Sequence, residues 1–274
     1  MELFGLGVWD IGLRLGLGVV VGFCIGLTGV GGGVLGLQVM TLVLRMDPVA
    51  AVGTTGLYIF LTKISAAFHH ARLGNIAWKP SVRLLAGAIP ANIAASRWIS
   101  AQGGDAGFME ALQTFIGAVI LFSAGVMVVD LVNTLRRKAE CGERNMAAKL
   151  DGHGAVQTVS TLLLGALIGG LVGATSVGGG VLLVPMLITL FGLGARRTVG
   201  TSIIIALVLS LATALVYGKT GEVVVSTAVV MATGSLLGVR GGARLSARIP
   251  ECGLRATMVA VILVAAIMML MKGP

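Results

Sequence analysis

The chain alternates long apolar runs with short polar stretches along its whole length. Ten apolar segments can be distinguished, at residues 13–27, 34–45, 50–70, 81–99, 108–132, 156–174, 181–193, 198–217, 224–240 and 254–271. Most have the roughly 17 to 25 residues that a helix needs to cross about 30 Å of hydrocarbon. The segments 34–45 and 181–193 are shorter, and each follows directly on a cluster of glycines. We therefore predict an all-α polytopic membrane protein in which two short broken helices follow Gly-rich motifs.

The two halves of the chain repeat each other at a shift of 147 residues. Without any gap, this shift places Gly22–Leu35 over Gly169–Leu182, and the motif Val52-Gly-Thr-Thr over Val199-Gly-Thr-Ser. The residues between the halves are polar and charged. The sequence therefore predicts a tandem duplication, with an N-terminal transmembrane repeat at 1–132, a linker at 133–153 and a C-terminal transmembrane repeat at 154–274.

Lysine and arginine are distributed unevenly among the predicted loops. If every segment makes one crossing or one half-hairpin and the N-terminus lies outside, 14 of the 20 Lys and Arg fall on the inner side, five of them in the linker. This asymmetry follows the positive-inside rule. Five segments per half is an odd number, so the second repeat enters the membrane from the opposite face. We therefore expect two inverted repeats of about five helical segments each, a cytoplasmic linker and both termini outside.

Composition agrees with a lipid environment and excludes several other classes. Only 11% of the residues are charged and 56% are hydrophobic, whereas about 25% of the residues in a soluble domain are charged. So few ionisable groups cannot cover the surface of a soluble enzyme, and the hydrophobicity excludes disorder. The net charge of +9 comes from basic residues between apolar runs, so no nucleic-acid partner is expected. Cys24, Cys141 and Cys252 lie far apart without metal-ligand spacing, so we expect no disulfide framework, metal or other cofactor.

The two glycine clusters are the first candidate binding site. Each precedes a short apolar segment, and consecutive glycines break helices rather than pack them. The first N–H groups of a helix lack intrahelical partners and carry about half a positive charge. Two such helix ends, brought together near the midplane by inverted repeats, would bind an anion. The residues of this candidate site are Gly31, Gly32, Gly33, Gly178, Gly179 and Gly180, with the hydroxyls of Thr28, Thr175 and Ser176 just before the breaks.

Further polar residues in the apolar segments extend the candidate site. Thr54, Thr55, Thr201 and Ser202 follow the second pair of motifs, and they either contact substrate or bond locally to the backbone and cap helices. Lys63 is the one basic residue well inside a predicted span. It either attracts the substrate or extends its stem to the inner interface. No Asp or Glu lies in the middle of a predicted span, which favours an anionic substrate over a cation.

Other residues in the spans are expected to serve helix packing. Small residues at a spacing of four let helix backbones approach closely, and this pattern includes Gly16, Gly18, Gly22, Gly26, Gly165, Gly169 and Gly173. Asn92 and Gln38 are expected to make interhelical hydrogen bonds, and Tyr217, Trp78 and Trp98 to anchor the chain at the membrane interface. No Ser/His/Asp arrangement and no His/Glu metal spacing occurs within the spans, so no catalytic residue is assigned.

The paired motifs resemble those of a known family. Gly29-Val-Gly-Gly-Gly-Val-Leu and Ser176-Val-Gly-Gly-Gly-Val-Leu, together with Val52-Gly-Thr-Thr and Val199-Gly-Thr-Ser, look like the TauE/SafE family of membrane permeases. The resemblance covers nearly the whole chain, including the duplication and the linker. It implies passage or export of small sulfur-containing anions, such as sulfite, sulfoacetate or related organosulfonates, across a bacterial inner membrane.

The hypothesis drawn from the sequence is therefore a secondary transporter that exports small sulfur-containing anions by alternating access. A small-molecule anion and the lipid bilayer are the expected partners, and the formation of a homo-oligomer is left open. An anion channel with the same binding site is the main alternative. An intramembrane enzyme or an assembly factor is a more distant one, because the spans hold no nucleophile with a matching base.

Overall fold

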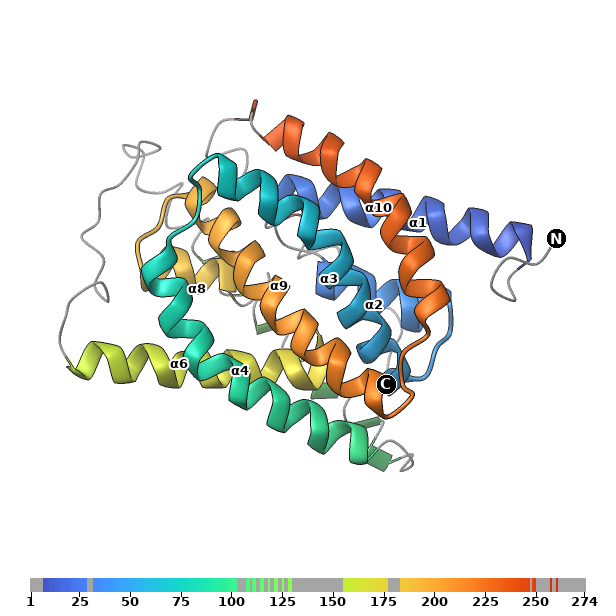
Figure 1. Cartoon of the computed structure of the whole chain (residues 1–274), viewed down its shortest axis with the longest axis horizontal. Coiled ribbons are helices and arrows are strands. Elements are labelled where there is room, and N and C mark those ends of the chain that lie inside the picture. Colours follow the sequence, from blue (N-terminus) through green and yellow to red (C-terminus); the bar gives the residue numbers. More distant parts are fainter. Residues whose placement is uncertain are drawn as a thin grey trace.

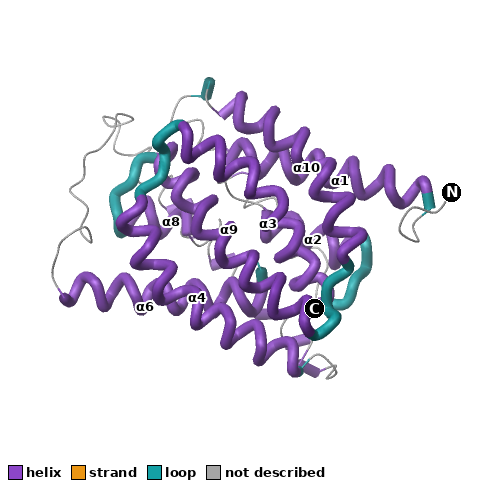
Figure 2. The backbone as a smooth tube through the Cα atoms, in the orientation of Figure 1, coloured by secondary structure: helices purple, strands orange, loops and turns teal. Residues whose placement is uncertain are grey.

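The computed structural model describes residues 7–28, 32–102, 155–176, 183–246 and 248–249, with scattered positions between 107 and 129 and residues 257 and 260. Every regular element in this part of the chain is helical and none is a strand (Figure 2), as the apolar pattern predicts. The elements are α1 (Val8–Thr28), α2 (Gly32–Gln38), the π-helical turn η1 (Val39–Val43), α3 (Pro48–Arg72), α4 (Trp78–Ala101), α6 (Ala155–Thr175), α8 (Leu183–Thr189), α9 (Ala195–Lys219) and α10 (Val225–Ser246).

These helices correspond to the predicted apolar segments, including the two short ones. The long helices have 21 to 25 residues, about 32 to 38 Å at the α-helical rise, so each is long enough to cross a bilayer. Four stretches are both long and apolar enough to count as candidate membrane spans: Trp9–Leu27, Pro48–Arg72, Thr158–Thr175 and Arg196–Lys219. Most of the predicted segments 108–132 and 254–271, and the whole linker 133–153, lie outside the described residues.

The helices form two bundles that each combine elements from both repeats. In one bundle α1 packs along α10, and α3 packs against α10 and α2. In the other α6 packs along α4, and α9 packs against α4, α6 and α8. Helices α3 and α9 join the two bundles at the centre of the molecule. Figure 1 shows the first bundle towards the upper right and the second towards the lower left.

The helix directions follow from which residues meet. Along α3 and α10, Thr54 lies beside Val224 and Thr62 beside Ser235, so these helices run parallel. Along α4 and α9, Ala77 lies beside Thr201 and Asn92 beside Thr213, so these two helices also run parallel. Helices α3 and α9 run antiparallel, because Gly53 lies beside Tyr217 whereas Gly56, further along α3, lies beside the earlier Thr213 of α9. A Cβ on Gly53 would lie 2.8 Å from Cβ of Tyr217, and a Cβ on Gly56 would lie 3.2 Å from Cγ2 of Thr213.

Glycines bring α1 to α10 and α6 to α4 at backbone distance. In each pair three glycines at a spacing of four lie directly against the backbone of the partner helix, so any side chain there would overlap main-chain atoms. The pairs are Gly18 with Met231, Gly22 with Ser235, Gly26 with Val239, and Gly165 with Leu84, Gly169 with Ala88, Gly173 with Asn92.

These two sets of contacts are one pattern seen twice. Adding 147 to Gly22 gives Gly169, and adding 147 to Ala88 gives Ser235, so each contact recurs with the roles of the two repeats exchanged. The duplication in the sequence is therefore also a duplication in the packing. Gly16 does not belong to it: the residue is exposed, and a Cβ there would meet nothing within 4 Å, so the packing prediction was wrong for this glycine.

Basic residues gather at one end of the molecule. The C-terminal ends of α3 and α10 lie at the same end as the N-terminal ends of α4 and α9, because the first two helices run opposite to the last two. Of the Lys and Arg that the structure describes, this end carries Arg72, Lys79, Arg83, Arg196, Arg197, Arg240, Arg244 and Arg248. The opposite end carries only Arg14, Arg45, Arg97 and Lys219.

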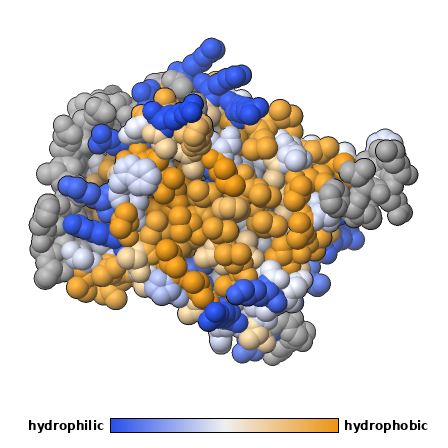
Figure 3. Space-filling view, viewed as in Figure 1, coloured by the Kyte–Doolittle hydropathy of each residue, from blue (hydrophilic) through white to orange (hydrophobic). Residues whose placement is uncertain are grey.

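The surface between the two ends is apolar. Large side chains such as Leu163, Leu167, Leu215 and Leu237 are more than half exposed. Figure 3 shows a hydrophobic band across the visible face, with polar residues gathered at two opposite margins. A continuous exposed apolar surface between polar ends is what a lipid-facing protein requires.

Candidate functional site

The first glycine cluster lies at the start of α2, inside the first bundle. Gly32 and Gly33 are buried, whereas Gly31 and the side chain of Thr28 lie outside the part that the structure describes. A Cβ added to Gly32 would lie 3.2 Å from Cδ1 of Ile25 in α1 and 3.6 Å from Cγ1 of Ile59 in α3. Helix α2 therefore begins between α1 and α3.

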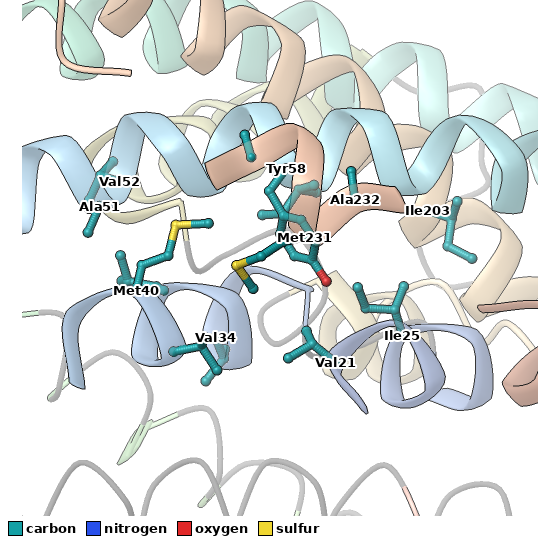
Figure 4. Packing of buried hydrophobic residues seen from close by; sticks show 14 of the residues in the cluster. Val21, Ile25, Val34, Met40, Ala51, Val52, Tyr58, Ile203, Met231 and Ala232 are labelled. Carbon is teal, nitrogen blue, oxygen red and sulfur yellow. The ribbon is translucent and has the colours of Figure 1, made fainter. Parts of the chain in front are cut away.

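The beginning of α2 lies halfway through the bundle. Ile59 is close to the middle of α3, which runs from Pro48 to Arg72. Further along the short helix, Gly36 packs on the side chain of Thr55, and the Thr55 hydroxyl donates to Sδ of Met40 at 3.2 Å. Helix α2 and η1 thus run back along the N-terminal half of α3; in Figure 4, Met40 lies opposite Val52. The short segment therefore covers only half the depth of the molecule.

The second glycine cluster begins where α6 ends. Thr175, the last residue of α6, is buried, and its hydroxyl donates to the carbonyl oxygen of Leu171 at 2.7 Å. Ser176 has a φ of 51°, in the left-handed region that ends a right-handed helix. Its hydroxyl donates to the carbonyl oxygen of Val52 in α3 at 2.9 Å, which ties the second glycine motif to the first repeat. Gly178, Gly179 and Gly180 lie outside the described residues.

Two of the predicted hydroxyl residues cap helices of the opposite repeat. The backbone N–H of Val224, just before α10, donates to Oγ1 of Thr54 at 3.0 Å. The backbone N–H of Ala77, just before α4, donates to Oγ1 of Thr201 at 3.0 Å. The second bond is the first one shifted by 147 residues in both partners, so the capping alternative raised from the sequence describes both threonines.

The structure does not bring all the predicted hydroxyls to one place. Thr54 and Thr201 lie in the second turns of α3 and α9, and these helices run antiparallel, so the two residues lie towards opposite ends. The hydroxyl of Ser202 is buried and donates to the carbonyl oxygen of Val199 within its own helix at 2.9 Å. Of this group, Thr55 contacts α2, through Gly36.

Lys63 lies in the interior of the molecule. Its side chain is only 2% exposed, so it does not extend to the membrane interface as one alternative supposed. It follows Ile59, which contacts the start of α2, by one helical turn. It also follows Gly56 by two turns, and a Cβ on Gly56 would lie 3.2 Å from Cγ2 of Thr213 in α9. Lys63 therefore leaves α3 on a face between the one that contacts the start of α2 and the one that contacts the second bundle.

A second polar cluster was missed in the sequence. The hydroxyls of Thr62 in α3 and Ser235 in α10 are 2.6 Å apart and fully buried. Tyr58, one turn before Thr62, is also fully buried, and its hydroxyl lies near the hydroxyls of Ser235 and Thr62. Figure 4 shows Tyr58 reaching from α3 towards Met231. The available signal was a tyrosine in the middle of an apolar segment, far from the interface where tyrosine usually lies.

The other predicted polar residues divide into confirmed and corrected cases. Asn92 exchanges hydrogen bonds with Thr213 of α9, at 3.1 Å and 3.3 Å, so the predicted interhelical bond is confirmed. Trp78 and Trp98 are 58% and 60% exposed, as expected for interface anchors. The prediction for Tyr217 was wrong: its side chain is fully buried, and its hydroxyl donates to the carbonyl oxygen of Gly173 at 3.2 Å.

The described residues contain no group of three or more His, Cys, Asp or Glu side chains placed to hold a metal ion. Among them, the basic side chain at mid-depth is that of Lys63, one turn after the residue that contacts the start of α2. The site is electropositive when Lys63 is protonated, because the N–H groups at a helix start also carry positive charge. Chemically, it can attract and hold an anion.

Comparison with known proteins identifies the family. The model of the family "Sulfite exporter TauE/SafE" matches residues 14–269. A "Probable membrane transporter protein YjnA" of Bacillus subtilis is 33% identical over 249 residues, covering 90% of this chain and 95% of the relative. A "Probable membrane transporter protein" of Haemophilus influenzae is 27% identical over 205 residues, covering 69% of this chain and 67% of the relative. No solved structure matches the chain.

Helices long and apolar enough to cross a bilayer, a lipid-facing surface and a family match over most of the sequence agree with one another. The chain therefore belongs to the TauE/SafE family and is a multi-pass membrane transporter.

Proposed function

We propose that this transporter carries a small sulfur-containing anion, such as sulfite or an organosulfonate, and exports it by alternating access. The proposal takes the class of substrate from the name of the matching family, sulfite exporter. The observation that carries it is the start of α2 at mid-depth, next to Ile59, with the buried Lys63 one turn beyond. A small anion suits this site because the helix start is positive, a protonated Lys63 adds a second positive group, and no Asp or Glu lies in the middle of a predicted span.

The end of the molecule that carries eight described Lys and Arg would face the cytoplasm of a bacterial inner membrane. This orientation puts the linker inside and both termini outside. The repeats would then be inverted in the membrane. Support comes from the helix directions: α3 runs antiparallel to α9, which is its counterpart in the second repeat.

The moving units would be the two bundles rather than the two sequence repeats. Each bundle contains helices from both repeats, which are held together by the glycine contacts and by the helix caps of Thr54 and Thr201. The bundles meet chiefly along α3 and α9, on the faces that carry Gly56 and Lys63. Rocking of one bundle against the other about this contact would expose the site first to one side and then to the other.

The test measures anion transport by the purified protein in liposomes. Sulfite, thiosulfate, sulfoacetate, methanesulfonate and taurine are compared with carboxylate analogues of the same size, first for thermal stabilisation of the protein and then for uptake. Gly32→Leu should abolish uptake, because a large side chain would fill the space at the start of α2. Gly32→Ala should reduce uptake less, because its Cβ meets only side-chain atoms of Ile25 and Ile59, at 3.2 to 3.6 Å, and these can shift.

Gly16→Leu is the matched control, since Gly16 is exposed and a Cβ there meets nothing within 4 Å. Normal uptake by Gly32→Leu would contradict the assignment of the site. If sulfur-containing anions neither stabilise the protein nor cross the membrane, the proposed substrate class is wrong. Kinetics distinguish a carrier from a channel. The uptake rate of a carrier saturates with anion concentration and the carrier shows counterflow of labelled anion, whereas a continuous pore shows neither and conducts far faster.

A further inference from the structure

Lys63 is a buried cation without a described counter-charge. Its side chain is only 2% exposed, and no hydrogen bond or ion pair joins it to another residue in the described part of the chain. Neither is there an Asp or Glu in α3, or in α2, η1, α9 or α10, the helices packed against it. An isolated ammonium group in a membrane interior is strongly disfavoured unless something compensates its charge.

The position also lacks a counterpart in the other repeat. The shift of 147 places Ser210 of α9 where α3 has Lys63, and the Ser210 hydroxyl donates to the carbonyl oxygen of Leu207 at 3.0 Å. The glycine contacts of the two repeats correspond, yet the charge is present once. The charge is therefore not required by the helix packing, because the equivalent position packs with a small neutral side chain.

The depth of Lys63 places it where both bundles can reach it. The residue lies three positions beyond the centre of α3, or about 4 to 5 Å along the helix axis. It shares its helix face with Gly56, whose neighbour Thr213 belongs to the second bundle. A group at this contact changes its access to water when one bundle moves against the other.

From this geometry we infer that Lys63 is the protonatable counter-ion of the transported anion, so that one proton crosses the membrane with each anion. The inference rests on the proposed function. In the empty site the amine is neutral, because no residue that the structure describes balances its charge. When an anion enters, the amine takes one proton from water and the ammonium group binds the anion. On the other side the anion leaves, the proton returns to water, and the neutral amine is restored.

Other titratable groups near this site cannot take over the role by position. In the described residues the charged groups lie at helix ends, Tyr58 lies on another face of α3, Tyr217 donates to Gly173, and His70 follows Lys63 by two turns at the C-terminal end of α3. The groups are Tyr58, His70 and Arg72 on α3, Tyr217, Arg196, Arg197 and Lys219 on α9, and Arg240 and Arg244 on α10; α2 and η1 carry none.

The experiment follows anion and proton movements together in liposomes at pH 7.5. The probes are thiosulfate, sulfoacetate and methanesulfonate, which stay fully ionised at this pH and bring no proton of their own. The membrane potential is held at zero, and a pH dye inside the vesicles reports protons. Wild-type protein should move one proton with each anion, in the same direction.

The decisive variant is Lys63→Arg, because arginine keeps the positive charge and does not release its proton. It should retain exchange of labelled for unlabelled anion and lose the accompanying proton movement. Lys63→Gln removes the charge, and anion binding should weaken by about ten- to a hundredfold, as expected when a charge-assisted hydrogen bond is lost. Lys219→Arg, at the exposed end of α9, is the matched control and should behave as wild type.

The outcomes separate this inference from the proposed function. Anion transport without proton movement in the wild type, or proton movement retained in Lys63→Arg, would overturn the role of Lys63 and leave anion transport standing. Absence of transport of any of these anions by the wild type would overturn both. Thermal unfolding of each variant shows whether a loss reflects misfolding, and Lys63→Met, which keeps the length of the side chain, replaces Lys63→Gln if that variant does not fold.

Discussion

Replacing Gly169 by alanine should push α6 away from α4, whereas the same change at the next residue should not. Gly169 faces α4, and a Cβ there would overlap the carbonyl oxygen of Ala88 and lie 2.6 Å from its carbonyl carbon. Gly170 lies on the same helix, and a Cβ there would meet nothing within 4 Å. The two variants change the composition identically and differ only in the direction of the new methyl group.

The magnitude follows from this geometry. Carbon atoms in contact are optimally about 3.5 to 4.0 Å apart, so the helices must separate by about 1 Å at Gly169. Overpacking costs about 1 to 3 kcal/mol, and the upper value is expected because the clash is with a backbone that cannot rotate away. Both variants gain up to about 1 kcal/mol in helix propensity. Gly169→Ala should therefore be less stable than Gly170→Ala by about 3 kcal/mol.

The assay is unfolding in mixed micelles with increasing detergent denaturant, followed by circular dichroism. The repeat supplies an internal check, because Gly22 packs on Ser235 as Gly169 packs on Ala88, so Gly22→Ala should be destabilised to a similar extent. Equal stability of the Gly169 and Gly170 variants would refute the close approach of α6 and α4. Destabilisation at Gly169 without destabilisation at Gly22 would refute the equivalence of the two interfaces.

Two further predictions concern the polar contacts between helices. Thr54→Val and Thr201→Val should each lower the free energy of unfolding by about 1 kcal/mol, the usual cost of a lost helix cap. Serine keeps the hydroxyl, so Thr54→Ser and Thr201→Ser should retain most of this stability. Equal losses of stability in the valine and serine variants would contradict the caps. Asn92→Ala and Thr213→Ala, measured singly and together, should show a coupling free energy of about 0.6 kcal/mol, typical of hydrogen bonds between membrane helices. Strict additivity of the two changes would show that the bond contributes nothing.

The helices themselves could be predicted from the sequence. Long apolar runs need a continuous helix in lipid, because every backbone N–H and C=O must be paired within the segment. The two short segments could be predicted as well, because consecutive glycines end a helix before it can cross the bilayer. The repeat at a shift of 147 residues predicted a tandem duplication, and the glycine contacts between helices recur at the same shift.

The helix partners could not be predicted in this way. A stripe of small residues such as Gly18, Gly22 and Gly26 fits the backbone of any helix that approaches it, so the stripe indicates close packing but not the partner. For the same reason the grouping into two bundles, each drawn from both repeats, appears only in three dimensions. Tyr217 shows the same limit, since an aromatic residue near the end of an apolar run is read as interfacial until a neighbouring helix covers it.

The candidate site divides in the same manner. Residue type and position alone marked Lys63 as unusual, because a cation inside an apolar run is costly wherever it lies. The tertiary structure decided that its side chain is buried near the start of α2, and that Thr54 and Thr201 cap helices towards opposite ends. Sequence fixes local properties such as length, polarity and helix breaks. Helix pairing, depth and the partners of each polar group depend on contacts between distant segments, and many different pairings satisfy the same local pattern.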